Sequence, residues 1–236
     1  MMKLSYLFFF ILTLVTLSVS AQQADTVNQL DSLGRKQGFW QQTNDQVKLI
    51  YEGSFRDNKP TGTFRYFYDN GKIKAVSTIE NDGQRSFTRT FHPNGKIMSE
   101  GLYNDKKKDS LWRFFDETGN LLAEEEYLNG LKNGKQISYF SGGQIFEILH
   151  YKDDVKDGEW KQYYPDGQLK LETNYTAGNR DGSFRHFYKN GKLNVEGTYS
   201  DGIKTGRWST YDENGRLILI ENYRNGTLTD SESFSE

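Results

Sequence analysis

The chain has 236 residues, a formal net charge of −2 and a sequence pI of about 6.0, so its bulk charge gives no indication of a nucleic acid or an anionic membrane as partner. Cysteine is absent, which excludes disulfides, thiolate metal ligands and cysteine nucleophiles. Aromatic residues make up 15% of the chain and all hydrophobic residues together only 35%, so a core has to be built largely from rings.

Residues 1–21 have the features of a signal peptide. Lys3 precedes an apolar run over residues 4–19, and the segment closes with the small residues Val-Ser-Ala. An uncleaved membrane anchor is the alternative, but the run is shorter than the roughly 20 residues that cross a bilayer. We therefore expect a mature chain that begins at Gln22, has no transmembrane segment, and is periplasmic, outer-membrane-associated or secreted.

A repeat of 24 residues fills the chain from Gly38 to Thr229. Its clearest marker is a glycine that recurs at this period, at Gly71, Gly95, Gly119, Gly143, Gly167, Gly191 and Gly215. Five of these seven glycines follow Asn or Asp. Asn-Gly and Asp-Gly are the strongest short-range signals for a type I′ hairpin turn, in which both central residues have positive φ.

Large rings recur with the same period. One column, here called the ring column, contains Trp40, Phe64, Trp112, Trp160, Phe184 and Trp208, and is interrupted by Thr88 and Gln136. A second column follows three residues later, at Phe67, Phe91, Phe115, Tyr139, Tyr163, Phe187 and Tyr211. A spacing of three does not fit the alternation of a strand, and either a β-bulge or a strong twist would reconcile the two columns.

These signals predict an all-β fold, an elongated single sheet of stacked antiparallel β-hairpins in eight 24-residue repeats. A single hairpin is marginal in water, so each unit has to cover the rings of its neighbour. We expect residues 22–37 to be a polar linker, residues 38–229 the repeat domain, and residues 230–236 a polar tail. The first unit is atypical because Val47 replaces the turn glycine, as expected where a repeat array ends.

The units resemble MORN repeats, in the variant form found in bacterial proteins. The residues that carry the resemblance are Gly-x-Trp-x-x-Tyr-Tyr-Pro-Asp-Gly-x-Leu-x-x-Glu in Gly158 to Glu172, and the equivalent elements from Gly206 to Tyr223. The resemblance implies stacked hairpins and an interaction role. Similar bacterial proteins are often labelled antitoxins, and MORN repeats are also linked with phospholipid binding, although the acidic balance of this chain gives no support for the latter.

Polar residues offer few candidates for chemistry. A glutamate column (Glu52, Glu100, Glu124, Glu172, Glu196) is either a ladder for cations or polar ligands, or a solvated strand face paired with lysines such as Lys72, Lys96 and Lys192. We favour the solvated face. The three histidines, His92, His150 and His186, fall at three different repeat positions, and Lys106 to Lys108 is expected to face solvent. We predict no catalytic, cofactor-binding or metal-binding residues and no enzyme activity.

Rings outside the repeated columns are the best candidates for an interaction surface, because a single-layer sheet cannot bury both of its faces. They are Tyr66, Tyr68, Phe114, Phe140, Tyr164 and Tyr188. We expect truncation of Tyr164 and Tyr188 to weaken binding with little loss of stability. The sequence therefore predicts an exported protein-interaction or scaffolding module of the cell envelope. The alternatives are a glycan-binding module and an antitoxin or immunity-like protein that neutralises a toxin outside the cytoplasm.

Overall fold

The structure is a computed structural model that describes residues 26–80 and 83–234, so the predicted signal peptide lies outside the described residues. The described residues form 19 β-strands. In chain order the strands are β1 (Gln29–Leu30), β2 (Lys36–Thr43), β3 (Leu49–Arg56), β4 (Lys59–Phe67), β5 (Ile73–Glu80), β6 (Arg85–Phe91), β7 (Ile97–Asn104), β8 (Lys107–Phe115), β9 (Leu121–Leu128), β10 (Leu131–Tyr139), β11 (Ile145–Lys152), β12 (Val155–Lys156), β13 (Gly158–Tyr163), β14 (Leu169–Thr176), β15 (Asn179–Phe187), β16 (Leu193–Ser200), β17 (Ile203–Tyr211), β18 (Leu217–Arg224) and β19 (Thr227–Ser233).

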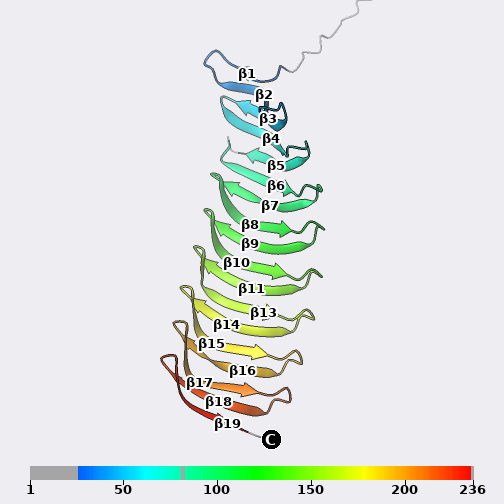
Figure 1. Ribbon diagram of the computed structural model, residues 1–236. Helices are drawn as coiled ribbons and strands as arrows, with labels where there is room; N and C mark the ends of the chain where they lie inside the picture. Colours follow the sequence, from blue (N-terminus) through cyan, green and yellow to red (C-terminus); the bar gives the residue numbers. More distant parts are fainter. Residues whose placement is uncertain (1–25, 81–82, 235–236) are drawn as a thin grey trace, which may run out of the picture.

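The strands follow one another as an antiparallel meander, which builds an elongated, open ladder (Figure 1). β12 and β13 are two parts of one rung, since both pair with β11. The predicted all-β array of stacked antiparallel hairpins is confirmed. The sheet also extends past residues 38–229, because β1 lies in the segment predicted as a linker and β19 continues to Ser233.

The turns at the repeated glycines are not type I′, and that prediction was wrong. In the turn of Tyr188 to Lys192, Gly191 N–H donates to the Tyr188 carbonyl (2.9 Å), and among these residues only Gly191 has positive φ (80°). This is the pattern of a type I turn followed by a glycine bulge. Asn190 is favoured for a different reason, since its side-chain oxygen accepts a hydrogen bond from Lys192 N–H (3.0 Å).

Type I′ geometry occurs instead at the opposite ends of the strands, in the two-residue turns that join one unit to the next. Asp201 and Gly202 both have positive φ (50° and 81°), and the residues that flank them, Ser200 and Ile203, are paired. Asp153 and Asp154 form the same turn without a glycine. The two hairpin edges of the sheet therefore have different turn chemistry.

Replacing Gly191 by valine is expected to destabilise the protein by about 1–3 kcal/mol, because a β-branched residue resists positive φ. Space is not the cause, since a Cβ at this position would meet only the flexible end of Gln168 at 3.3 Å. Chemical denaturation of the mature chain measures the loss. Gly191→Asn is the matched control, since asparagine tolerates this conformation and should lose clearly less. Equal losses would show that backbone conformation does not matter here.

A β-bulge reconciles the two ring columns. In every hairpin from β4–β5 to β17–β18 the pairing register shifts immediately before the second ring, for example between Tyr66 and Phe67 and between Thr210 and Tyr211. Residues before the shift alternate regularly. One surface of the sheet, here called the ring face, carries the ring column; the other, the polar face, carries the glutamate column.

The core lies on the ring face and is built between units. Trp112 is only 1% exposed, and Phe64 and Trp208 are each 3% exposed. Each of these three rings lies over a glycine of the preceding strand, namely Gly101, Gly53 and Gly197, and a Cβ at Gly53 would lie 2.5 Å from the Phe64 ring. This glycine column lets the rings lie flat against the backbone, which is how a single-layer sheet buries an indole.

Candidate functional site

Cations cover the ring column. Lys108 Nζ lies 4.8 Å from the Trp112 ring centroid and 4.6 Å from that of Phe114, and Lys204 Nζ lies 4.3 Å from that of Trp208. These cations recur at one position of the repeat and are here called the cation column; they are Lys36, Lys108, Lys132, Lys156, Arg180 and Lys204. Their aliphatic stems shield the rings, while the charged ends gain cation–π attraction.

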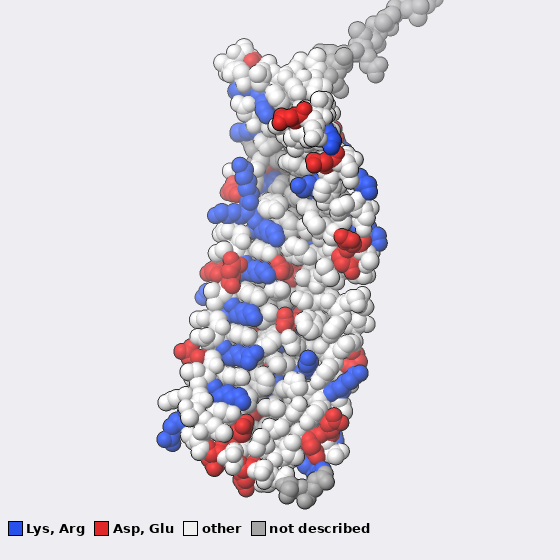
Figure 2. Space-filling view, in the orientation of Figure 1, with Lys and Arg blue, Asp and Glu red and all other residues white. Residues whose placement is uncertain are grey.

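Lys108 was predicted to face solvent, and this was wrong. It lies against aromatic rings, and burial lowers the pKa of its ammonium group. Figure 2 shows lysine and arginine side chains at successive levels of the ladder, as a column repeating once per unit requires.

The six rings predicted as an interaction surface are all half-buried and occupy two repeat positions. Tyr66 and Phe114 lie on the ring face. The ring centroids of Phe114 and Trp112 are 6.3 Å apart, and those of Tyr66 and Phe64 are 6.4 Å apart. The remaining four (Tyr68, Phe140, Tyr164, Tyr188) stand at the first residue of the glycine-bulge turns, along one edge of the sheet. Two of the six candidate rings therefore lie on the ring face, and four lie along the edge formed by the glycine-bulge turns.

The edge tyrosines join one unit to the next. Tyr188 donates its hydroxyl proton to the Tyr211 carbonyl (2.9 Å), and Tyr164 and Tyr68 make the same bond to Phe187 (2.8 Å) and Phe91 (2.6 Å). His92 occupies this position in its own unit, with Nε2 2.9 Å from the Phe115 carbonyl oxygen. These side chains have a structural role in addition to any role at the surface.

Substituting Tyr164 and Tyr188 together by phenylalanine is therefore expected to destabilise the protein, in contrast to the expectation from sequence. Each substitution removes one inter-unit hydrogen bond, worth about 0.5–1.5 kcal/mol. Thermal melts of the double variant test this. Tyr163→Phe is the control, since that hydroxyl makes no hydrogen bond within residues 26–80 and 83–234. A double variant as stable as the control would contradict the structural role.

The glutamate column lies on the polar face and pairs with arginines. The pairs are Arg65–Glu52 (3.2 Å), Arg89–Glu100 (2.9 Å), Arg113–Glu124 (2.9 Å) and Arg185–Glu172 (3.0 Å). The glutamates therefore form ion pairs on a strand face, as expected, but their partners are arginines and not the expected lysines. Lys72 and Lys192 instead donate to carbonyl groups of the next turn, at Pro93 (2.7 Å) and Asn214 (3.0 Å).

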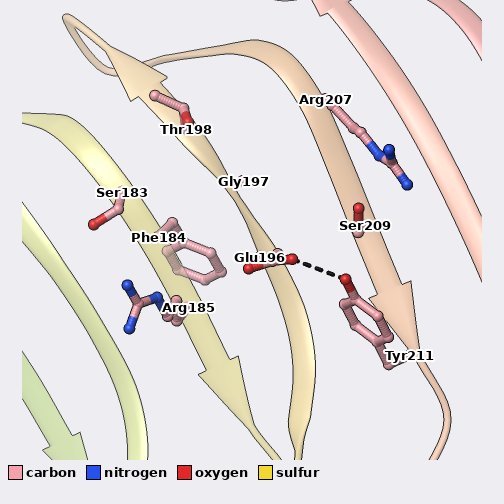
Figure 3. A pocket seen from close by; sticks show the side chains of 9 residues that line it. All are labelled: Ser183, Phe184, Arg185, Glu196, Gly197, Thr198, Arg207, Ser209 and Tyr211. Carbon is pink, nitrogen blue, oxygen red and sulfur yellow. Dashed lines mark hydrogen bonds between the residues drawn. The ribbon is translucent and has the colours of Figure 1, made fainter. Parts of the chain in front are cut away.

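Glu196 differs from the rest of the glutamate column. Ser209 stands across from it on β17, at the repeat position that holds arginine in four other units. Glu196 accepts a hydrogen bond from Tyr211 (2.8 Å), as Glu124 does from Tyr139 (2.8 Å). That bond raises the pKa of the Tyr211 phenol. The small Ser209 leaves a shallow polar hollow of about 460 Å³, in which Glu196 lies between the strands that carry Arg185 and Arg207 (Figure 3).

Two features of the ring face could have been found in the sequence and were missed. The cation column recurs at 24 residues like the rings, and the glycine column recurs at Gly53, Gly101 and Gly197, each directly after a glutamate of the glutamate column. Both are visible only when every column of the repeat is compared, including columns that change residue type from one unit to the next.

Within the two described ranges, 26–80 and 83–234, no three His, Asp or Glu side chains gather as a metal site. The same part of the chain contains no helix long and apolar enough to cross a bilayer.

The architecture defines a class of protein: an open β-hairpin repeat in which each unit covers the rings of its neighbour. Comparison with known families agrees. The MORN repeat variant matches residues 60–81, 88–105, 108–129, 132–153, 156–177, 180–201 and 204–225. The chain belongs to the MORN repeat variant family, as the residues from Gly158 to Glu172 indicated. MORN repeats act in binding, so the chain is a repeat protein involved in binding.

Other comparisons add little. No curated protein matches the chain. Among solved structures, it is similar to a chain described as "Crystal Structure of TcdB2-TccC3", with 12% identity and a TM-score of 0.18. The similarity covers 80% of this chain but only 14% of that chain, and so low a TM-score carries no argument about fold or function.

Proposed function

We infer that the chain is an exported, non-enzymatic repeat protein that acts as a protein-interaction or scaffolding module of the cell envelope. The observation that carries this proposal is the aromatic edge, where Tyr68, Phe140, Tyr164 and Tyr188 stand half-buried at the same position of different units. Half-exposed aromatic side chains are favoured as interface anchors. Set at one spacing along a rigid sheet, they suit an extended partner that contacts several units.

Export is supported by the N-terminal segment, in which Lys3 and the apolar run precede Val-Ser-Ala. N-terminal sequencing of the exported protein should give Gln22 as the first residue. A product that keeps Met1 and stays in the membrane would contradict cleavage and favour an anchored protein.

An antitoxin or immunity-like role remains the alternative that the family resemblance suggests. It differs from the scaffolding role in its partner, which would be a single toxin in the same compartment. A toxin encoded beside this protein, and neutralised by it in a growth assay, would favour this alternative.

The interaction proposal is tested by deleting whole units. The mature chain is immobilised to capture partners from envelope fractions, and the affinity of a captured protein is then measured for the intact chain and for a variant that lacks residues 182–229. The deletion removes two whole repeats, so the segment that forms β19 rejoins in register. Affinity is expected to fall stepwise with the number of units, while circular dichroism shows that the remaining units are folded.

Two results would count against the proposal. Unchanged affinity after deletion of the last units would place the contact at one level of the ladder. A measurable turnover that a single Asp, Glu or His substitution abolishes would show that the protein is an enzyme.

A further inference from the structure

The ring column is broken at two levels, and the protein treats the two breaks differently. The column holds Phe64 and Trp112 on either side of Thr88, and Trp112 and Trp160 on either side of Gln136. At both levels the space that an indole or phenyl ring fills elsewhere has to be occupied by something else, or stay open.

At Gln136 the protein fills the space with its own polar side chains. Lys132 Nζ lies 2.8 Å from Glu125 Oε1 and 3.2 Å from Gln136 Oε1, and Tyr127 donates its hydroxyl proton to the other Glu125 oxygen. An ion pair and two hydrogen bonds thus satisfy the groups at this level.

At Thr88 the side chains are too small to fill the space. Thr88 pairs its hydroxyl with that of Ser77 (2.8 Å), and Thr90 pairs with Ser99 (2.7 Å). Ser77 and Thr88 are buried, at 8% and 6% exposed. The position of the cation column is Gln84 in this unit, and the lysine that borders this level is Lys106.

A hollow results on the ring face. It has two adjoining parts of about 290 and 440 Å³, which share Tyr66, Ser77, Ser86 and Lys106 as lining residues. This is the size range of sites for small ligands. The hydroxyl pairs form its floor. The Ser77–Thr88 pair uses one hydroxyl proton internally and retains a second proton for an acceptor, whereas Thr90 also donates to the Ser99 carbonyl (3.5 Å).

Tyrosines form the walls of the hollow. Tyr51 and Tyr66 stand on one side, with their ring centroids 6.1 Å apart. Tyr103 stands on the other side, with its ring centroid 4.8 Å from that of Trp112. The phenol hydroxyls of these three tyrosines have no hydrogen-bond partner within the described part of the chain. The hollow therefore joins aromatic faces to several unused hydroxyl donors and acceptors.

We propose that this hollow is a saccharide-binding site that takes a neutral pyranose ring of a glycan in the place of the missing aromatic ring. The apolar C–H face of a pyranose packs against a tyrosine ring, and its hydroxyl groups exchange hydrogen bonds with the Ser/Thr floor and the tyrosine hydroxyls. A phenyl or indole ring from a protein partner fits less well, because it would leave the floor hydroxyls without acceptors.

The test uses the mature chain and three disaccharides, cellobiose, maltose and N,N′-diacetylchitobiose, titrated into the millimolar range and followed by NMR. At least one is expected to bind. Thr88→Trp, which restores the ring column, should abolish binding, and Tyr66→Ala should weaken it by about tenfold or more. Thr63→Trp, an exposed position on the polar face, is the matched control and should bind as the unaltered chain does.

Thr88→Trp should fold, since Trp160 already packs with Leu149, and Phe184 is paired with Thr173, at the repeat position of Ser77. If it does not fold, Tyr66→Ala decides the outcome alone. Binding that survives both variants would overturn the site, and no binding of any of the three disaccharides would overturn the ligand class. Loss of a captured envelope protein on Thr88→Trp, with no sugar bound, would show that the hollow takes a protein side chain; the scaffolding proposal would then stand without this one.

Discussion

Replacing Trp112 by alanine should cost about 3–5 kcal/mol of unfolding free energy, the scale for deletion of a fully buried indole. Trp112 is 1% exposed, and its ring centroid lies 4.8 Å from that of Tyr103. The ammonium group of Lys108 lies over the Trp112 ring. Its indole N–H donates to the Leu102 carbonyl (2.9 Å), a bond that alanine also loses. These contacts come from β7 and β8, which belong to successive units, so the substitution weakens the interface between two units.

Trp40→Ala is the matched control for this loss. Trp40 occupies the same column in the first unit, where it is only half-buried, and it therefore has less to lose. Urea denaturation followed by circular dichroism measures both variants of the mature chain. Equal losses at Trp40 and Trp112 would mean that the ring column is not the source of cohesion between units.

The repeat made most of the fold predictable from the sequence. A glycine every 24 residues and rings in fixed columns indicate stacked hairpins without any knowledge of the contacts. The turn type was not predictable from the Asn-Gly dipeptide alone. Asn190 keeps negative φ and caps Lys192 N–H with its side chain, whereas Asp153 and Asp154 adopt positive φ without any glycine in the turn.

The partners of charged side chains were harder to predict. Glu172 lies beside Arg185 on the neighbouring strand, and the register that brings them together depends on a bulge of two residues near the start of β15. A bulge shifts the pairing register by one or more residues, and hydrophobic alternation in the sequence does not reveal the size of that shift. Lysine partners chosen by closeness in sequence, such as Lys192, were therefore wrong.

The hollow at Thr88 illustrates a different limit. The sequence shows Thr88 and Gln136 as equivalent interruptions of the ring column. Only the side chains around them distinguish the two levels, since Glu125 and Lys132 fill one space while Ser77 leaves the other open. Six rings chosen from the sequence included Tyr66, which lines that hollow, but also Tyr188, whose hydroxyl joins two units.

Gly101→Ala is expected to destabilise the protein by about 1–3 kcal/mol or more, through overpacking. An added Cβ would lie 2.5 Å from Cε2 of Trp112, and the backbone on both sides is held by the sheet. The same change at Gly197 would meet Trp208 in the same way, so the two variants are independent measurements of one contact. Urea denaturation gives both losses.

The cause of the loss can be isolated because the chain already contains the complementary pair. At the equivalent positions one repeat earlier the chain has Ser77 and Thr88, a small residue on each strand, with their hydroxyl oxygens 2.8 Å apart. Gly101→Ser should therefore be strongly destabilising beside Trp112, yet cost little when it is added to Trp112→Thr, since the added side chain then meets a small partner with a hydroxyl. The double-mutant cycle should show coupling of about 0.5–3 kcal/mol, the range for residues in contact. Additive losses would mean that the glycine column is required for backbone conformation and not for the close approach of the rings.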